Sequence, residues 1–225
     1  MLQLTSKGLI LRGDLDSLRD RFATNHYVVL EKLLEPALLA KVQRQMERAP
    51  WRSSSHGKFG TEFTPDDPVT VHLLFFLLNS PKFLNVVRTI TGYPQISDFT
   101  GRVYRLTAGP QHQFSWHSDT KDRQRQVGFS LNLSPDVFSG GTFELRDRLT
   151  LAPLAHVNNT GFGDALLFRI SDDLQHRVTE VVNAVAKTAC AGWFRVGDES
   201  FFEELVAGLN THSSAATVAC STHTK

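Results

Sequence analysis

From Pro94 onward the sequence consists of short stretches in which apolar and polar residues alternate, with glycine or proline turns between them. In the clearest stretch, Val127, Phe129 and Leu131 are separated by single small or polar residues. Strand side chains point alternately to the two faces of a sheet, so this pattern predicts short β-strands. Many such strands are typical of a sandwich or barrel, and we expect a mainly β jelly roll (a double-stranded β-helix) over about residues 94–200. Further strands are expected over 102–107, 114–119, 142–145, 149–154, 165–170, 178–182 and 187–196.

The first 93 residues are expected to form a helical layer packed on the outer sheet of the jelly roll. Apolar residues at helical spacing predict helices that begin near Asp14 and at Pro36, and two more over 69–79 and 81–91. One strand is expected at 25–30, where β-branched and aromatic residues cluster. We expect a single domain over 1–205, and a flexible tail over 206–225, where little can bury apolar surface.

The segment from Trp51 to Pro68 shows neither the alternation of a strand nor the spacing of a helix, and it is rich in serine, threonine, proline and aspartate. It is too long for a tight connection and is therefore expected to be a polar loop. Two interpretations of this segment are possible. It is either a lid over the binding site or a surface loop without a function of its own.

Composition excludes several classes of function. At 225 residues with 41% hydrophobic content and a net charge of +1, the chain has no global field to recruit nucleic acid or an anionic membrane. A local basic cluster at 121–125 is either a solvated loop or a contact for a phosphate or carboxylate. Cys190 and Cys220 are the only cysteines, so no disulfide framework is expected. Without a signal pattern or a long apolar run, we expect a cytoplasmic protein with a small-molecule or peptide substrate and no nucleic-acid or membrane partner.

The residues that carry chemistry begin with His117 and Asp119. On a continuous strand, residues two apart share a face and could both reach one metal ion. His176 can supply a third ligand from another strand. Two imidazoles and one carboxylate on one side of an iron leave the opposite positions open, as in the facial triad of non-haem Fe(II) enzymes.

The motifs around these ligands occur in a characteristic order: His117-x-Asp119, Gly140-Gly141, Gly163 to Phe168, His176-Arg177-Val178, Lys187 and Trp193-Phe194. This order resembles the 2-oxoglutarate/Fe(II)-dependent oxygenases, in particular the prolyl-hydroxylase-like branch, from about Val103 to Arg195. The resemblance implies an enzyme that uses Fe(II), 2-oxoglutarate and O₂ and releases succinate and CO₂. It also implies that His117, Asp119 and His176 are the metal-binding and catalytic residues. The expected reaction is hydroxylation of an unactivated C–H bond in an amino acid, a peptidyl residue or a small natural-product intermediate.

The distal carboxylate of 2-oxoglutarate needs a cation inside the barrel. Lys187 matches the family's Lys/Arg position, whereas Arg195, on the same face of a continuous strand, lies eight residues or about 26 Å further along, at ~3.3 Å per residue. Lys187 is therefore expected to bind the cofactor. Tyr104 and Thr188 are candidate auxiliary donors, and Asn132 is expected to face the cofactor pocket.

Two other functions remain open. The chain could be a cupin-like metal-binding jelly roll that acts as a sensor or an isomerase without oxidising anything. Alternatively, the same oxidative chemistry could give desaturation or cyclisation. A halogenase is disfavoured because those enzymes replace the carboxylate ligand with a small residue, and Asp119 is present.

Overall fold

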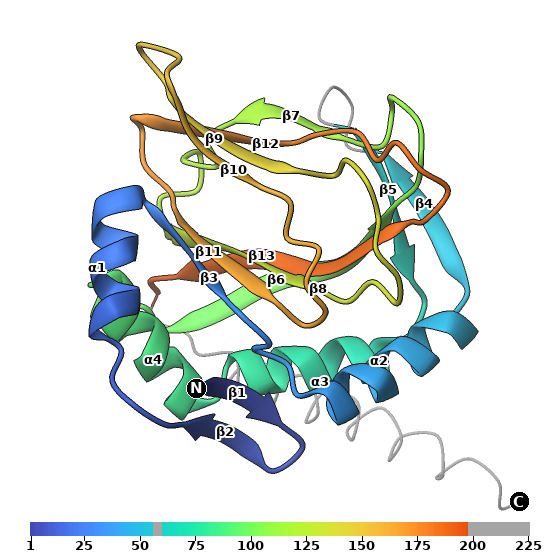
Figure 1. Ribbon diagram of the computed structural model, residues 1–225, viewed down its shortest axis with the longest axis horizontal. Coiled ribbons are helices and arrows are strands. Elements are labelled where there is room, and N and C mark those ends of the chain that lie inside the picture. The colour runs from blue at the N-terminus through green and yellow to red at the C-terminus, as the bar shows by residue number, and fades with distance from the viewer. Residues whose placement is uncertain (56–59, 198–225) are drawn as a thin grey trace, which may run out of the picture.

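The computed structural model describes residues 1–55 and 60–197. The expected tail over 206–225 lies outside these residues. Two antiparallel sheets face each other, and helices cover the outer face of the larger one (Figure 1). This arrangement confirms the predicted mainly β, jelly-roll fold with helices on its outer sheet.

The four-stranded sheet has the order β10-β9-β12-β7 and carries two of the three predicted metal ligands. Its strands are β10 (Pro153–Val157), β9 (Phe143–Asp147), β12 (Leu174–Val178) and β7 (Phe114–His117). Two of these strands differ from the sequence prediction: β10 begins only at Pro153, near the end of the expected 149–154 stretch, and β12 ends at Val178, where the expected 178–182 stretch begins.

The seven-stranded sheet has the order β3-β11-β8-β13-β6-β5-β4 and carries Lys187. Its strands are β3 (Tyr27–Leu30), β11 (Ala165–Arg169), β8 (Arg125–Asn132), β13 (Lys187–Arg195), β6 (Asp98–Leu106), β5 (Thr61–Pro65) and β4 (Trp51–Ser55). The long strands β6, β8 and β13 lie side by side and hold its centre.

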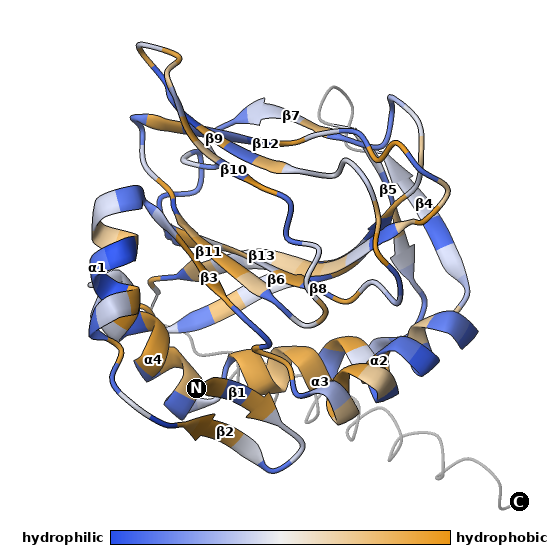
Figure 2. Ribbon diagram, viewed as in Figure 1, coloured by the Kyte–Doolittle hydropathy of each residue, from blue (hydrophilic) through white to orange (hydrophobic). Residues whose placement is uncertain are grey.

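The helices are α1 (Asp16–Asn25), α2 (Pro36–Arg48), α3 (Pro68–Leu78) and α4 (Pro81–Thr91). Proline at the first turn of α2, α3 and α4 suits a position whose N–H has no helical partner. Gly92 ends α4 with φ 73°, a left-handed cap that favours glycine. The predicted stripe of α2 is buried, and Figure 2 shows α3 apolar along most of its length. Their apolar faces meet the sheet in one core that includes Phe83, Phe99 and Phe194.

The N-terminal part is less purely helical than expected, because it also contains β1 (Leu2–Thr5) and β2 (Gly8–Leu11) as a hairpin. The predicted loop over 51–68 is wrong as well. Strands β4 and β5 pair within it, and Phe63 of β5 pairs with Arg105 of β6, so the hairpin extends the larger sheet. Glu62 is fully buried there in an ion pair with Arg102. This contact joins residues far apart in the sequence, which explains why local composition misses the hairpin.

Among the described residues, no single helix is long and apolar enough to cross a membrane. By length and composition alone, only α3 and α4 taken together pass that test, with a 57° bend between them.

Gly128 makes room for the packing that supports the site. A Cβ at this position would lie 2.0 Å from the ring of Phe168, so only glycine fits without a shift. The Phe168 ring lies 4.6 Å from the ring of His176 and 4.6 Å from that of Phe143, measured between centroids. The position of His176 therefore depends on the absence of a side chain on β8.

We expect Gly128→Ala to lower the free energy of unfolding by about 1–3 kcal/mol, because Phe168 must leave a well-packed position. Gly197→Ala is the matched control, since its Cβ would meet nothing closer than 3.7 Å. Chemical denaturation followed by circular dichroism measures both. Equal stability of the two variants would contradict this account of the packing.

Candidate metal centre

The two histidines predicted as ligands lie opposite each other on neighbouring strands. His117 is the last residue of β7, and His176 is central in β12. The antiparallel pairing of these strands places His176 directly across from His117, with ring centroids 4.2 Å apart. Paired residues in a sheet point to the same face, so both imidazoles enter the space between the sheets.

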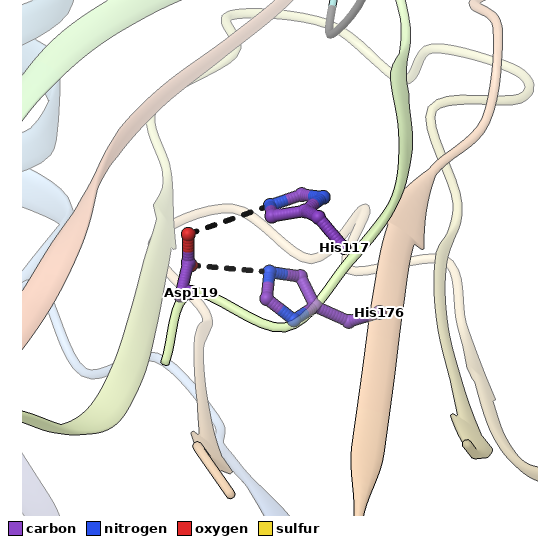
Figure 3. Close-up of side chains that lie close together, drawn as sticks. All are labelled: His117, Asp119 and His176. Carbon is purple, nitrogen blue, oxygen red and sulfur yellow. Dashed lines mark ion pairs between the residues drawn. The ribbon is translucent and has the colours of Figure 1, made fainter. Parts of the chain in front are cut away.

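Asp119 reaches the same point by a different route from the one expected. Strand β7 ends at His117, and Asp119 follows it with φ 59° in the left-handed region. Strand alternation therefore does not align the two side chains, because a turn carries Asp119 back toward the histidines. Aspartate is among the residues that tolerate this backbone conformation. Figure 3 shows the three side chains converging from β12, the end of β7 and the following loop.

The separations suit one metal ion. His117 Nε2 lies 3.7 Å from Asp119 Oδ1, and His176 Nε2 lies 3.4 Å from Asp119 Oδ2. One potential ligand atom from each residue lies within 4.8 Å of the others. Nitrogen and oxygen ligands at about 2.0–2.2 Å from a metal stand roughly 3 Å apart when they occupy adjacent positions. A small movement of these side chains would therefore let them hold an ion.

Supporting contacts fix the orientation of the ligands. His117 Nδ1 lies 2.6 Å from the Ser115 carbonyl oxygen, which suits an Nδ1–H donor and leaves Nε2 with its lone pair for a metal. Trp193 Nε1 donates to Asp119 Oδ2 at 2.7 Å, and Arg125 Nη1 approaches Oδ1 at 3.5 Å. The Arg125 guanidinium is stacked on Trp193, 3.6 Å from the ring centroid.

The electrostatics favour the forms that bind metals. Burial alone would raise the pKa of Asp119, but hydrogen bonding and charge from His176, the charge of His117 and the Trp193 hydrogen bond together lower it. Burial, followed by the charge of His176, lowers the pKa of His117. An ionised carboxylate beside a neutral imidazole is the state that coordinates a divalent cation.

The three side chains line an inner cavity of about 100 Å³ that also reaches Lys187. Lys187 is only 2% exposed, and its ammonium donates to the Gly141 carbonyl oxygen at 2.6 Å. No ion pair among the described residues includes it. Burial lowers the pKa of Lys187 to about 8. Its other contact among the described residues is with the Phe138 ring, 5.5 Å from the ammonium nitrogen. A buried cation that has a carbonyl and an aromatic ring but no carboxylate beside it can accept an anionic ligand.

Residues 101–195 match the model of the 2OG-Fe(II) oxygenase superfamily. Over this segment, which is less than half of the chain, the protein is similar to that superfamily. Its members use Fe(II), 2-oxoglutarate and O₂, and the described site offers the side chains that such cofactors require. The predicted resemblance to the superfamily is confirmed for this segment. No curated protein matches the chain.

Solved oxygenase structures share the fold at low sequence identity. An oxidoreductase of the 2OG-Fe(II) oxygenase family from Burkholderia pseudomallei is 14% identical, with a TM-score of 0.64 over 84% of this chain and 95% of that one. A prolyl-4-hydroxylase from Pseudomonas putida is 15% identical, with a TM-score of 0.62 over 81% of this chain and 99% of that one. A prolyl hydroxylase from Trichoplax adhaerens, in complex with a hypoxia inducible factor peptide fragment, is 15% identical, with a TM-score of 0.59 over 80% of this chain and 88% of that one.

The remaining predicted cofactor contacts of the oxygenase segment divide into two groups. Tyr104 is buried and lines the inner cavity, and burial raises its pKa, so its hydroxyl stays protonated and can donate. Asn132 and Thr188 do not line it. The Asn132 amide is engaged by the Gly161 carbonyl and the Ser134 N–H, each at 3.0 Å, and Thr188 Oγ1 accepts from Arg105 Nε at 3.1 Å. These contacts give no support to a role for Asn132 or Thr188 in cofactor binding.

Two other cations that could be considered in place of Lys187, Arg195 and Arg177, have partners of their own. Arg195 donates to Asp98 Oδ2 at 2.6 Å, and Arg177 donates to Glu144 Oε2 at 2.6 Å. Neither arginine lines the inner cavity.

Sequence reasoning missed several residues of the oxygenase site. Asn159 lines the inner cavity; its Oδ1 is buried with no hydrogen-bond partner, while its Nδ2 donates to the Ser130 carbonyl at 3.3 Å. Arg102 lines the same cavity and is oriented by Glu62, and Trp193 holds Asp119. No local motif marks Asn159 or Arg102. Trp193 belongs to the Trp193-Phe194 motif of the sequence analysis, but the sequence alone does not predict its hydrogen bond to Asp119.

We expect Trp193→Phe to weaken Fe(II) binding about ten- to hundredfold, as is typical when a ligand loses its supporting partner. The matched control is Trp51→Phe, which removes an indole hydrogen bond to the Met46 carbonyl outside the site. Anaerobic metal titration followed by calorimetry measures both affinities. Unchanged affinity in Trp193→Phe would show that the indole does not orient Asp119.

Proposed function

We propose that the protein is a 2-oxoglutarate-dependent hydroxylase that acts on an unactivated C–H bond of an amino acid, a peptidyl residue or a small natural-product intermediate. His117, Asp119 and His176 would hold Fe(II), and Lys187 would bind the distal carboxylate of 2-oxoglutarate. The observation that carries the proposal is that these three side chains and the buried ammonium line one cavity.

When bound, Fe(II) and 2-oxoglutarate would supply the oxidation of substrate by O₂, with release of succinate and CO₂. The protein's own residues would bind and orient these groups and exclude water from the cavity. Phe129, Leu166 and Phe168 line the inner cavity with apolar surface and limit the entry of water. Tyr104 offers a neutral donor from the cavity wall.

We expect Lys187→Ala to raise the dissociation constant for 2-oxoglutarate ten- to hundredfold, since a charge-assisted hydrogen bond contributes about 1.5–3 kcal/mol. Arg195→Gln should leave it nearly unchanged, because Arg195 is paired with Asp98. Calorimetry on the anaerobic Fe(II) protein, corrected for the folded fraction, measures both. The reverse ordering would assign the anchor to Arg195.

The pH dependence of the same measurement tests the charge of Lys187. Its free ammonium has a pKa of about 8, so binding should be nearly constant below that pH. Above it, binding requires uptake of a proton, and affinity should fall toward tenfold per pH unit. Lys187→Arg should flatten this slope, because an arginine stays charged. A slope identical in wild type and Lys187→Arg would place the titrating group elsewhere.

Succinate formation separates the hydroxylase from a non-oxidative cupin-like protein. With Fe(II), 2-oxoglutarate and O₂ the wild type should release succinate, and His117→Ala, Asp119→Ala and His176→Ala should each abolish both metal binding and succinate release. His156→Ala is the control, because that side chain is 67% exposed and paired with Glu144. Product analysis by mass spectrometry then distinguishes hydroxylation, a gain of one oxygen, from desaturation or cyclisation. Metal binding without any succinate would favour the cupin-like alternative.

A further inference from the structure

An outer cavity of about 760 Å³ adjoins the candidate metal site. It shares Arg102, Phe114, His117, Asp119 and Trp193 with the inner cavity, whereas Lys187 lines the inner cavity only. A molecule in the outer cavity would therefore contact two of the three candidate ligands without occupying the place assigned to 2-oxoglutarate. Its volume lies within the range of about 300–1,000 Å³ that is usual for small-molecule sites.

The charged side chains that line the outer cavity are mostly positive. Of the described residues that line it, four are cations, namely Arg102, Lys121, Arg125 and Arg148, and one is a carboxylate, Asp119. The whole chain has a net charge of only +1, so this is a local concentration of charge. Arg102 lies in β6, Lys121 in the connection between β7 and β8, Arg125 at the start of β8 and Arg148 just after β9, so the fold assembles the four cations.

Two of these cations are already neutralised. Arg102 donates to the fully buried Glu62, with one contact at 2.8 Å. Arg125 donates to Asp122 at 3.1 Å and lies flat on Trp193. Together, Arg125 and Trp193 form a fixed wall beside Asp119.

The other two cations are available. Lys121 and Arg148 are exposed, and no ion pair within 4.0 Å joins either of them to a carboxylate of the described chain. Arg148 makes one long contact, 3.3 Å, to the Asp172 carbonyl oxygen. After the hydrogen bonds from Thr120 and Arg123, the charge of Arg148 also helps to lower the pKa of the exposed Asp172 carboxylate, with which an anionic ligand would compete for Arg148. Both side chains can therefore bind an anionic group at the cost of little more than their own ordering.

We infer that the outer cavity binds a small substrate through an oxyanion, a carboxylate or a phosphate, held by Lys121 and Arg148. The inference rests on the proposed function and gives it a substrate class. A divalent iron, the Asp119 carboxylate, a 2-oxoglutarate dianion and the Lys187 ammonium sum to zero formal charge. The loaded centre therefore offers no net attraction to an anion, and the cations of the outer cavity supply it.

Binding to the anaerobic Fe(II) protein saturated with 2-oxoglutarate tests the inference, because the saturating cofactor blocks the inner cavity. The probes are benzoate and phenyl phosphate, with benzamide and phenol as their neutral counterparts, and calorimetry gives the dissociation constants. We expect the anionic probes to bind more tightly, and added salt to weaken them alone. The tighter of the two anions identifies the group as carboxylate or phosphate.

The variants assign the binding to the named side chains. Lys121→Gln and Arg148→Gln should each raise the dissociation constant of the anionic probe about three- to tenfold and leave the neutral probe unchanged. Lys82→Gln, an exposed cation on α4, is the matched control and should change neither. Equal binding of charged and neutral probes, or anion binding that both variants retain, would overturn the inference.

Wild-type succinate release without any probe is measured separately. Its absence would count against the proposed function, whereas the probe titrations would still show whether the outer cavity binds anions.

Discussion

The site depends on the pairing of β7 with β12. This register sets His117 across from His176, and a slip of one strand by one residue would turn its histidine to the other face of the sheet, away from its partner. The rest of the site is built around this pair. Phe168 packs against His176 because Gly128 leaves space for it, and the turn after β7 brings the Asp119 carboxylate back toward the Nε2 atoms of both histidines. The left-handed backbone at Asp119 is therefore part of the site, since an extended continuation of β7 would carry the carboxylate away.

Lys187 illustrates the other constraint on the fold. An ammonium that is 2% exposed and has no carboxylate partner among the described residues destabilises the free protein, and burial correspondingly lowers the pKa of Lys187. A dianionic cofactor would remove this penalty on binding. The fold and the proposed cofactor are thus coupled: the same burial that disfavours the free cation strengthens its attraction for a carboxylate.

The sequence predicted much of this molecule because much of it is specified locally. The alternation of apolar and polar residues predicts the strands β6, β8, β11 and β13. Proline residues followed by apolar residues at helical spacing predict α2, α3 and α4. The three candidate ligands are predicted because their residue types and order are distinctive, and the structure brings them together.

The features that the sequence did not predict depend on distant contacts. The β4–β5 hairpin is a polar stretch that becomes strand by pairing with β6 and by the ion pair between Glu62 and Arg102. The Trp193 hydrogen bond to Asp119 joins residues 74 positions apart. Asn132 was predicted to face the cofactor pocket. In the structure its amide is instead hydrogen-bonded to loop residues Gly161 and Ser134, contacts that the local sequence does not indicate.

A crystal structure of the anaerobic complex with Fe(II) and 2-oxoglutarate tests the central claim most directly. We expect the metal within about 2.0–2.2 Å of one nitrogen of His117, one oxygen of Asp119 and one nitrogen of His176. The distal carboxylate of 2-oxoglutarate should lie within about 3 Å of Lys187 Nζ. A metal bound by a different set of side chains, or a cofactor carboxylate held by Arg102 with Lys187 unpaired, would contradict the account.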